Sequence, residues 1–516
     1  MGGRYYNAAM NMRIHSVVSV GVSGVLIDIE CSMSNNLPAI VIVGSASKAV
    51  DEAKERVRAA FGSSELKLPR KRLTLNLAPA DIPKSDSGLD LAMAVAILST
   101  DGQIRLPEPD STAFLGELGL DGSIRPIRGI IGKLLACREL GLTEVVIPAK
   151  NLEQARLVPG LTLYAADSLR SVYEHFAGLT SLKATVPSTS PLTDKAVLPG
   201  SAGSLDQIVG QAAAKRALEI AAAGGHNVLL SGPPGTGKTM LARALPDLLP
   251  SLTQEELLEV TQLHSLVSHN YNQIVSTRPF RSPHHSASHV AVIGGGLTLR
   301  PGEISLSHRG VLFMDEFPEF SRQTLESLRQ PLEDRVVSVA RAKDSVDYPA
   351  DFILVATANP CPCGFYGTTK PCSCLPAQIN RYQQKLSGPI VDRIDLFTNV
   401  HEVEHARLLQ GEAAGSAEPL LQRIALARRR QATRQGPGRL NASLSNAELR
   451  KHAALSPEAK AVLDTAAERL GISARSYMRS LKTARTIADL ADSAEISRQH
   501  ISEALQFRRP ETVPAF

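Results

Sequence analysis

Residues 232–239 read Gly-Pro-Pro-Gly-Thr-Gly-Lys-Thr and directly follow the apolar run 227–231. The spacing G-x-x-x-x-G-K-T is the P-loop pattern, placed where a buried strand is expected to turn into a helix. Glycines let backbone amides approach phosphate oxygens closely, where a side chain would block them. The stretch therefore predicts an α/β fold with a parallel sheet and a site for a nucleoside triphosphate, expected to be ATP.

The loop also supplies two functional side chains. Lys238 is expected to bring a positive charge to the β and γ phosphates, and Thr239 to offer its hydroxyl to Mg²⁺. A Gly/Pro-rich surface turn is the alternative, but it does not explain the apolar helix that follows at 240–245. The residues predicted to bind ATP are Gly232, Pro233, Pro234, Gly235, Thr236, Gly237, Lys238 and Thr239.

A second motif predicts hydrolysis. Residues 310–316 form an apolar strand that ends in Asp315 and Glu316. After a P-loop, Asp315 is expected to hold Mg²⁺ through water, and Glu316 to polarise the attacking water. A solvated strand end is the alternative for this fragment alone.

The composition narrows the class of protein. Length 516 predicts about three domains, and 43% hydrophobic with 21% charged residues is typical of a globular chain. A net charge of +5 permits nucleic acid as a partner, whereas the absence of tryptophan disfavours an aromatic platform for bases. No apolar run reaches the ~18 residues of a membrane span, and no secretory leader is seen, so a cytoplasmic location without a membrane is expected. Met12 is an alternative start to Met1.

The pattern along the chain predicts four regions. Residues 12–180 alternate between strands, such as 17–30 and 39–43, and helices, such as 47–61 and 89–98. Residues 181–204 are rich in Ser, Thr, Pro and Lys and predict a linker. Residues 205–400 carry the ATPase motifs, and residues 417–508 have a helical pattern.

With these motifs in place, the chain resembles the AAA+ ATPases of the magnesium-chelatase-like group, and within it the ComM/YifB family of competence-associated proteins. The segments that carry the resemblance are 38–44, 81–88, 278–285, 294–296, 300–306 and 358–364. The resemblance implies a Lon-protease-like α/β N-terminal domain, an AAA+ core and a C-terminal helical lid. It also implies a hexameric, ATP-driven helicase that promotes DNA branch migration during natural transformation.

The resemblance extends to single residues. Asn359, at the end of an apolar run, is similar to the sensor that positions water near the γ phosphate, with a turn former as the alternative. Arg393 is similar to an arginine finger that acts on the neighbouring subunit, with a salt bridge to Asp392 or Asp395 as the alternative. Arg475 is similar to the sensor-2 arginine, and Arg479, one helical turn away, is the second choice. An arginine supplied in trans implies a closed homo-oligomeric ring.

Two segments are candidates for DNA contact. Residues 335–348 alternate as a hairpin does, with Arg341 and Lys343 near its tip, and related hexameric helicases point such a hairpin into the pore. Residues 288–307 resemble a second hairpin, in which Gly294-Gly-Gly296 would let the backbone approach phosphates. Solvated hairpins are the alternative for both. The five arginines within 422–434 are expected on a solvated helix face, and His284, His285 and His289 are expected to be buried and hydrogen-bonded rather than metal-binding.

The N-terminal domain resembles the Lon-type protease, which uses a Ser–Lys pair. Alignment places Ile131 at the lysine position and Asp86, between Ser85 and Ser87, at the serine position. Lys133 lies two residues on, which turns it ~200° around a helix and away from the site. The domain is therefore predicted to lack the dyad and to serve binding or assembly.

Four of the six cysteines, Cys361, Cys363, Cys372 and Cys374, lie within 361–374. Thiolates brought together by this spacing are suited to a tetrahedral, structural Zn²⁺ site. Reduced thiols without metal are the main alternative, and an iron–sulfur cluster is a second.

Three functions remain open at this point. The favoured one is a motor on single-stranded or branched DNA, with recombination proteins as possible partners. A magnesium-chelatase-type motor subunit, which acts through protein partners, would share the core but would not need the N-terminal domain or the cysteines. An ATP-dependent protease is disfavoured by Ile131.

Overall fold

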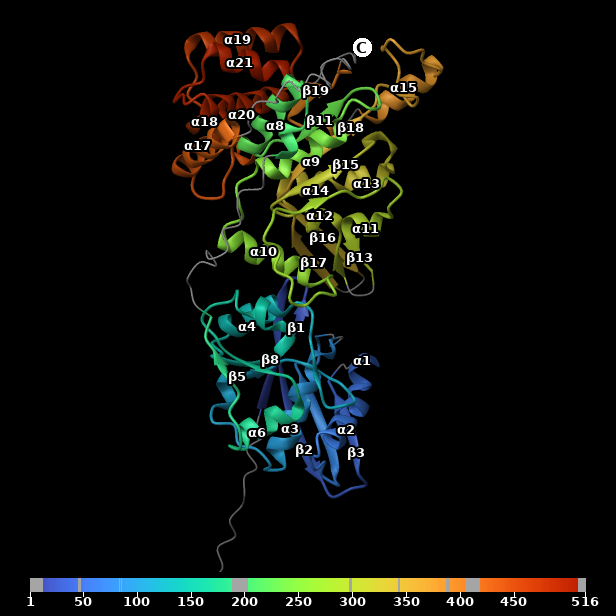
Figure 1. Ribbon diagram of the computed structural model, residues 1–516, viewed down its shortest axis with the longest axis vertical. Helices are drawn as coiled ribbons and strands as arrows, with labels where there is room; N and C mark the ends of the chain where they lie inside the picture. Colours follow the sequence, from blue (N-terminus) through green and yellow to red (C-terminus); the bar gives the residue numbers. More distant parts are fainter. Residues whose placement is uncertain are drawn as a thin grey trace, which may run out of the picture. The chain divides into compact units, whose positions relative to one another are not determined.

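The computed structural model describes residues 13–508 except 45–47, 83, 85, 188–202, 297–298, 342–343, 387–389 and 404–417. The chain forms two compact units (Figure 1). The first contains the N-terminal part up to Thr193 together with Gln254–Val275, and the second contains Asp194–Thr253 and Ser276–Phe516. Most of the predicted linker 181–204 lies outside the described residues.

The first unit is built on an eight-stranded mixed sheet. Its strands, from edge to edge, are β10 (Ala184–Thr185), β9 (Thr162–Ala166), β8 (Glu144–Pro148), β5 (Thr112–Phe114), β1 (Arg13–Val20), β2 (Ser23–Ser34), β4 (Arg72–Ala78) and β3 (Ala39–Val43). The single strand predicted over 17–30 is wrong, because Gly21 turns the chain with a φ of 63° and β1 pairs with β2 antiparallel. Glycine suits this turn because it adopts positive φ without a steric cost.

Helices cover both faces of this sheet. Adjacent residues Val17 and Val18 of β1 belong to separate apolar clusters, as expected when side chains alternate between faces. One cluster includes α2 (Ala53–Ser63), α3 (Asp90–Thr100) and α6 (Leu169–Phe176), and the other includes α4 (Ile130–Glu139) and α5 (Leu152–Ala155). The predicted helix 89–98 thus forms as α3.

Helix α10 (Gln254–Ser265) belongs to the first unit although its sequence lies within the ATPase region. Its Leu257 and Leu258 pack against the cluster around α4. Gln262 Nε2 donates to Val22 O at 2.6 Å. The boundary predicted at 205–400 counted this helix with the ATPase core, and the structure assigns it to the N-terminal unit instead.

The second unit contains a five-stranded sheet with the order β12 (Phe280–Arg281), β15 (Val311–Met314), β18 (Ile353–Ala358), β11 (Val228–Ser231) and β19 (Leu396–Asn399). All four pairings are parallel, which confirms the predicted α/β core. Helix α9 (Lys238–Leu248) follows β11 and buries Leu241, Ala242 and Leu245. The P-loop therefore lies at the carboxyl end of a central strand, where α/β sheets commonly bind ligands.

The predicted helical region 417–508 is confirmed. Its helices are α17 (Glu418–Gln435), α18 (Asn446–His452), α19 (Pro457–Arg469), α20 (Ala474–Leu490) and α21 (Arg498–Gln506). Residues of these helices share one apolar core with β11, β18 and α8 (Ala212–Gly224). The lid is thus packed onto the ATPase sheet.

The solvated face predicted for 422–434 is confirmed only in part, because Arg423 and Arg429 are exposed whereas other arginines of this helix are half-buried. Arg423 pairs with Glu219 at 2.7 Å, and Arg434 pairs at 2.7 Å with Asp489, whose side chain is 1% exposed. Arg428 Nε donates to Ala222 O at 2.8 Å. These arginines hold α17 on the core. No helix in the described part of the chain combines the length and the apolarity needed to cross a bilayer.

Candidate nucleotide-binding site and its surroundings

The P-loop connects β11 to α9, and its glycines meet backbone requirements. Gly235 and Gly237 have φ values of 80° and 88°, in the left-handed region that favours glycine. At Gly232 an added Cβ would lie 2.2 Å from Val400 O. The loop can therefore pass between the sheet and a bound phosphate only with glycine at these positions.

Lys238 is buried, with 9% of its surface exposed, and its ammonium has neutral partners. It donates to Gly232 O and Pro233 O, both at 2.7 Å, and to Asn359 Oδ1 at 3.1 Å. Burial lowers the pKa of Lys238 to about 8, although the charges of Asp315 and Glu316 act in the opposite direction. The site thus holds a cation whose contacts are uncharged oxygens.

The two acids after β15 lie beside the loop. Thr239 Oγ1 donates to Asp315 Oδ2 at 3.3 Å, which brings the two predicted Mg²⁺ ligands together. Thr357 of β18 was not predicted as a site residue. Its hydroxyl donates to Asp315 Oδ1 at 2.5 Å and accepts the Glu316 N–H at 3.0 Å. A polar residue inside the otherwise apolar run 353–358 was the signal for it.

These residues enclose a pocket of about 380 Å³. It is lined by Pro234, Gly235, Thr236, Gly237, Lys238, Thr239, Met240, Asp315, Glu316, Thr357 and Asn359. The structure thus brings most of the predicted ATP-site residues together, and the donor set fits Mg²⁺–ATP: a hydroxyl and a carboxylate for the ion, and amides with a lysine for the phosphates.

The prediction that the three histidines are buried is wrong. His284 is exposed, and its ring centre lies 4.1 Å from that of His285. His285 Nδ1 lies 3.5 Å from Glu316 Oε2, which places an imidazole beside the predicted catalytic acid. Within the described residues the histidines do not join a cluster of metal ligands, whereas the four cysteines do.

Arg393 and Arg475 lie together, outside the pocket that contains Lys238. Arg393, in η5 (Val391–Arg393), places Nη2 2.6 Å from Glu333 Oε1, and Arg475 of α20 contacts the same oxygen. Arg393 therefore forms a salt bridge with Glu333, whereas the alternative expected one with Asp392 or Asp395. Both arginines and Glu333 line a cavity of about 560 Å³.

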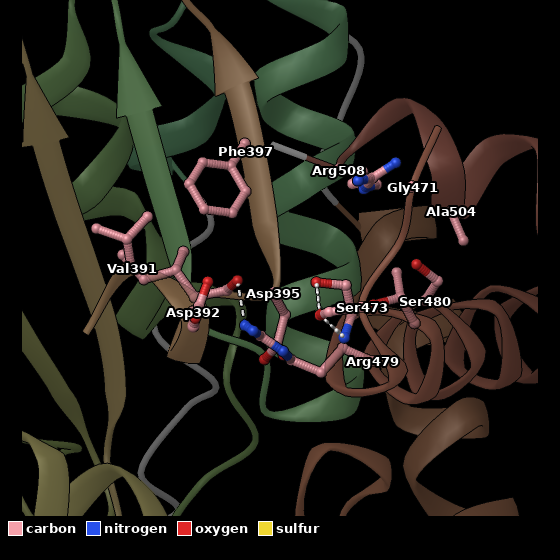
Figure 2. Close-up of a pocket in the computed structure, with 13 residues that line it drawn as sticks. Val391, Asp392, Asp395, Phe397, Gly471, Ser473, Arg479, Ser480, Ala504 and Arg508 are labelled. Atoms are coloured by element: carbon pink, nitrogen blue, oxygen red, sulfur yellow. Dashed lines mark hydrogen bonds between the residues drawn. The ribbon is translucent and has the colours of Figure 1, made fainter. Parts of the chain in front are cut away.

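Arg479, the second choice for sensor 2, has a different environment. Figure 2 shows it among the residues of a pocket between the lid and the segment that contains Asp392 and Asp395. Its Nη1 donates to Ile394 O at 2.8 Å, and burial lowers its pKa. Arg479 thus fastens α20 to the segment that carries Arg393.

The hairpin predicted over 335–348 forms from β16 (Val336–Arg341) and β17 (Asp344–Pro349). In the backbone register, Arg341 lies opposite Asp344. Lys343 and the side chain of Arg341 lie outside the described residues. The second predicted hairpin forms from β13 (Gly294–Gly295) and β14 (Arg300–Pro301).

The two hairpins contact each other. An added Cβ at Gly294 would lie 3.3 Å from Val339 Cγ2 of β16. The hydroxyl of Tyr348 in β17 donates to Leu299 O in the second hairpin. A displacement of one hairpin is therefore expected to move the other.

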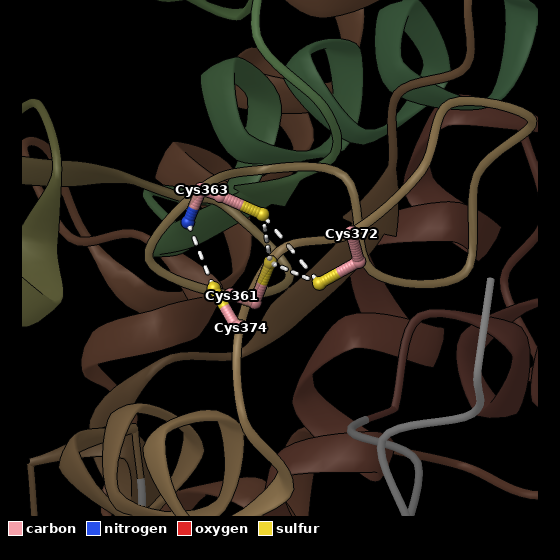
Figure 3. Close-up of side chains that lie close together, drawn as sticks. All are labelled: Cys361, Cys363, Cys372 and Cys374. Carbon is pink, nitrogen blue, oxygen red and sulfur yellow. Dashed lines mark hydrogen bonds between the residues drawn. The ribbon is translucent and has the colours of Figure 1, made fainter.

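The four cysteines converge (Figure 3), and their sulfur atoms all lie within 4.8 Å of one another. The Sγ–Sγ distances are 3.4 Å for Cys361–Cys363, 3.7 Å for Cys361–Cys372 and 3.5 Å for Cys363–Cys372. These distances are too long for disulfides and approach the edge of about 3.8 Å that a tetrahedron of 2.3 Å Zn–S bonds would have. The donor set fits Zn²⁺.

The cysteine loop also contacts the P-loop. Gly364 has a φ of 86°, and an added Cβ would lie 2.6 Å from Pro234 Cγ and Cδ. Tyr366 N donates to Cys361 Sγ at 3.3 Å, so the sulfur cluster orders the backbone on both sides of this contact. The geometry joins the four-cysteine segment to the loop expected to bind phosphate.

Comparison with known proteins supports this reading of the site. Three family models match: "Magnesium chelatase, subunit ChlI" over 204–408, "Subunit ChlI of Mg-chelatase" over 29–151, and "Magnesium chelatase, subunit ChlI C-terminal" over 414–508. Competence protein ComM of Haemophilus influenzae is 41% identical over 504 residues, which cover 96% of this chain and 97% of that protein. The uncharacterized protein YifB of Salmonella typhimurium is 40% identical over 497 residues, 96% of each chain. Lon protease 2 of Bacillus subtilis is 31% identical over 174 residues, 30% of each.

This chain belongs to the ComM/YifB family of magnesium-chelatase-like AAA+ proteins. Membership of that family indicates an ATPase that uses ATP and Mg²⁺.

In this member of the ComM/YifB family, the prediction that Lys133 points away from the site of the Lon-type dyad is wrong. The buried ammonium of Lys133 contacts the carboxylate of Asp86, the residue at the predicted serine position. Two residues of a helix point about 200° apart, so Ile131 and Lys133 face different sides of α4. Ile131 is the one that faces away from Asp86, into the apolar cluster of α4. The lysine is thus present, and its partner is a carboxylate. Ser87 instead donates to Glu117, and Ser85 lies outside the described residues.

Proposed function

We propose that this protein is one subunit of a homo-hexameric, ATP-driven motor that acts on DNA. The observation that carries the proposal is the separation of the two halves of an ATPase site. Lys238, Asp315, Glu316 and Asn359 surround one pocket, whereas the finger arginine lies in another cavity. An arginine that stabilises phosphoryl charge must reach the phosphate, so Arg393 would serve the pocket of a neighbouring subunit.

Within one pocket the residues have distinct tasks. Bound Mg²⁺ would neutralise charge on the β and γ phosphates, held by Thr239 and Asp315. Lys238 would exchange its carbonyl partners for phosphate oxygens. Glu316 would orient and polarise the attacking water, and Asn359 would position it. Arg393, with Arg475 beside it, would stabilise negative charge at the γ phosphate from the adjacent subunit.

DNA is the proposed substrate of the motor. The β16–β17 hairpin supports this choice, because Arg341 and Lys343, expected near its tip, would neutralise backbone phosphates without reading bases. Relatives include a competence protein, which supports a role in taking up or integrating DNA. We therefore propose helicase activity that promotes branch migration on single-stranded or branched DNA during natural transformation, with recombination proteins as further partners.

A structural Zn²⁺ in the four-cysteine loop completes the proposal. The contact between Gly364 and Pro234 supplies a route from the metal loop to the P-loop. Purified protein is expected to hold about one zinc per subunit, and the Cys363→Ser, Cys372→Ser double variant to lose it. Cys31→Ala, which changes a buried cysteine outside the cluster, is the control that should keep the metal. Protein that is zinc-free yet fully active would overturn both the site and its role.

One alternative keeps specific support. The family models favour a chelatase-type motor that drives metal insertion through protein partners. A protease is disfavoured, because an aspartate stands where the nucleophilic serine would be and Lys133 is paired with its carboxylate.

ATP hydrolysis measured with no DNA, single-stranded, duplex and forked DNA separates these functions. The proposal expects stimulation by DNA and branch migration of a synthetic junction. Arg341→Ala with Lys343→Ala should remove the stimulation, reduce the salt dependence of DNA binding and spare basal hydrolysis. A rate unaffected by every DNA would favour the chelatase-type motor.

The trans arrangement has its own test. Arg393→Ala should bind ATP but hydrolyse it poorly, and mixing it with Lys238→Ala protein should restore activity at hybrid interfaces. Mixed rings without any rescue would contradict a finger supplied by the neighbour.

A further inference from the structure

One carboxylate holds both arginines that the proposed function assigns to the neighbouring ATP. Glu333 lies in α14 (Arg329–Asp334), Arg393 in η5 and Arg475 in the first turn of α20. The Arg393 side chain is 10% exposed, so its guanidinium is held inside the cavity, whereas Glu333 is 44% exposed. Three segments distant in sequence therefore meet at one acidic side chain.

Asp351 and Asp395, two other acids that line this cavity, have different partners. Asp351 pairs with Arg309 and with Arg335, each at 2.9 Å. Asp395 accepts the Asn227 N–H at 3.2 Å and lies 3.4 Å from His226. The same cavity is lined by three further cations, Arg335, Arg479 and Lys482. Glu333 is thus the carboxylate that pairs with both arginines in a cation-rich cavity.

Glu333 is also connected to the proposed DNA hairpin. Helix α14 ends at Asp334, Arg335 turns the chain with a φ of 58°, and β16 begins at Val336. In the same helix, Gln330 Nε2 donates to Ser338 Oγ of β16 at 3.1 Å. A force on the hairpin therefore reaches the helix that carries the carboxylate through both the backbone and a side-chain contact.

We infer that Glu333 is a positioning residue that retains Arg393 and Arg475 in the resting subunit and yields them to a neighbour's phosphates when the hairpin engages DNA. The inference rests on the proposed ring ATPase. Because ion pairs with partly exposed carboxylates are weak, a phosphate group that carries more charge can displace this one. DNA on the hairpin would lower the cost further by shifting α14.

The test is Glu333→Gln, which keeps the size of the side chain and removes its charge. Basal ATP hydrolysis should rise about two- to tenfold, the range expected for loss of weak ion pairs. The rate at saturating DNA should stay unchanged, so the stimulation ratio falls by the same factor. The KM for ATP should not move, because Glu333 is absent from the residues that line the ATP pocket.

Glu326→Gln is the matched control. Glu326, in α13 (Arg322–Ser327), pairs with Arg322 at 3.0 Å and lies 3.8 Å from Arg329. The Glu326→Gln variant removes the same charge from a neighbouring helix. It should leave the ratio of DNA-stimulated to basal ATP hydrolysis at the wild-type value. Glu333→Asp, which keeps the charge on a shorter side chain, should give an intermediate ratio and serves if Glu333→Gln does not fold.

The outcomes separate this inference from the proposed function. An unchanged stimulation ratio in Glu333→Gln, or a rate lowered equally with and without DNA, would overturn the positioning role. If Arg393→Ala is inactive at the same time, the trans finger survives and only the Glu333 inference falls. Full hydrolysis by Arg393→Ala would overturn the finger itself.

Discussion

Two buried lysines, Lys238 of the ATPase unit and Lys133 of the N-terminal unit, have opposite kinds of partners. Lys238 of the ATPase unit donates to three uncharged oxygens, those of Gly232, Pro233 and Asn359. Lys133 of the N-terminal unit lies on the carboxylate of Asp86. Both side chains have little contact with solvent, with exposed fractions of 9% and 0%.

The difference explains why one lysine marks a binding site and the other an internal support. A buried ammonium with neutral partners leaves a positive charge uncompensated, and an arriving anion gains from it. A buried ammonium on a carboxylate is already neutralised, so an anion would have to displace the acid. The lowered pKa of Lys238 is the electrostatic sign of the open arrangement.

Removing each lysine gives the largest contrast. Lys238→Ala should lower the rate of ATP hydrolysis by at least about 100-fold, because a preorganised cation at the phosphates is lost. Lys133→Met, with a side chain of similar length, should hydrolyse ATP at a rate within twofold of wild type. Steady-state rates per folded subunit, with folding checked by circular dichroism, measure both. Loss of hydrolysis in Lys133→Met would remove the distinction between the two sites.

The second test gives Lys238 a charged partner of the kind that Lys133 has. Asn359→Asp would place a carboxylate where an amide oxygen lies 3.1 Å from Lys238 Nζ. ATP affinity should fall about 10- to 100-fold, since the new charge both pairs with the lysine and repels phosphate. Equilibrium binding is the measurement, because Asn359 is also proposed to act in hydrolysis.

Asn359→Ala is the control for that variant. It removes the same amide without adding charge, so its affinity should fall less. Equal losses in the two variants would mean that the neutrality of the partners is not what keeps the site open.

The third test removes the charged partner of Lys133. Asp86→Asn would leave the fully buried Lys133 without a charged partner and should lower the free energy of unfolding of the N-terminal unit by about 3 kcal/mol. Lys133→Met should cost less, because Asp86 is 24% exposed and accepts the Gly88 N–H at 2.9 Å. Thermal unfolding of the single and double variants measures the coupling. Additive losses would show that the pair does not act as a unit.

The two lysines also show what the sequence can predict. Residues 232–239 are contiguous, so the spacing of one motif was enough to predict the loop between β11 and α9 and the pocket that Lys238 lines. Lys133 and Asp86 are 47 residues apart and come together only through packing. The alignment placed the lysine position at Ile131, two residues before Lys133. It therefore predicted that Ile131, and not Lys133, faces Asp86. Local pattern predicted the helix but not its rotation.

Other non-local features were missed for the same reason. Arg475 and Glu333 are 142 residues apart, so nothing in either segment indicated that they share one cavity. The apolar spacing of α10 predicts a helix but does not say which unit it packs against. Cysteines were easier, because four of them lie within 14 residues of one another in sequence and their side chains need only a local fold.

The smallest expected effect is the pH dependence of ATP affinity, which tests directly whether the charge of Lys238 contributes to ATP binding. With a pKa of about 8 in the free protein, Lys238 loses its charge as the pH rises above 8, whereas bound phosphates favour the charged form. ATP affinity should therefore fall as pH increases from 8, by up to about tenfold per pH unit. The nucleotide phosphates, whose last pKa lies near 6, are already ionised in this range. At pH 8.5, binding should take up about three-quarters of a proton, which calorimetry in two buffers of different ionisation enthalpy measures. Any binding that remains in Lys238→Ala should take up none, and identical enthalpies in both buffers for the wild type would mean that Lys238 is already fully charged before ATP arrives.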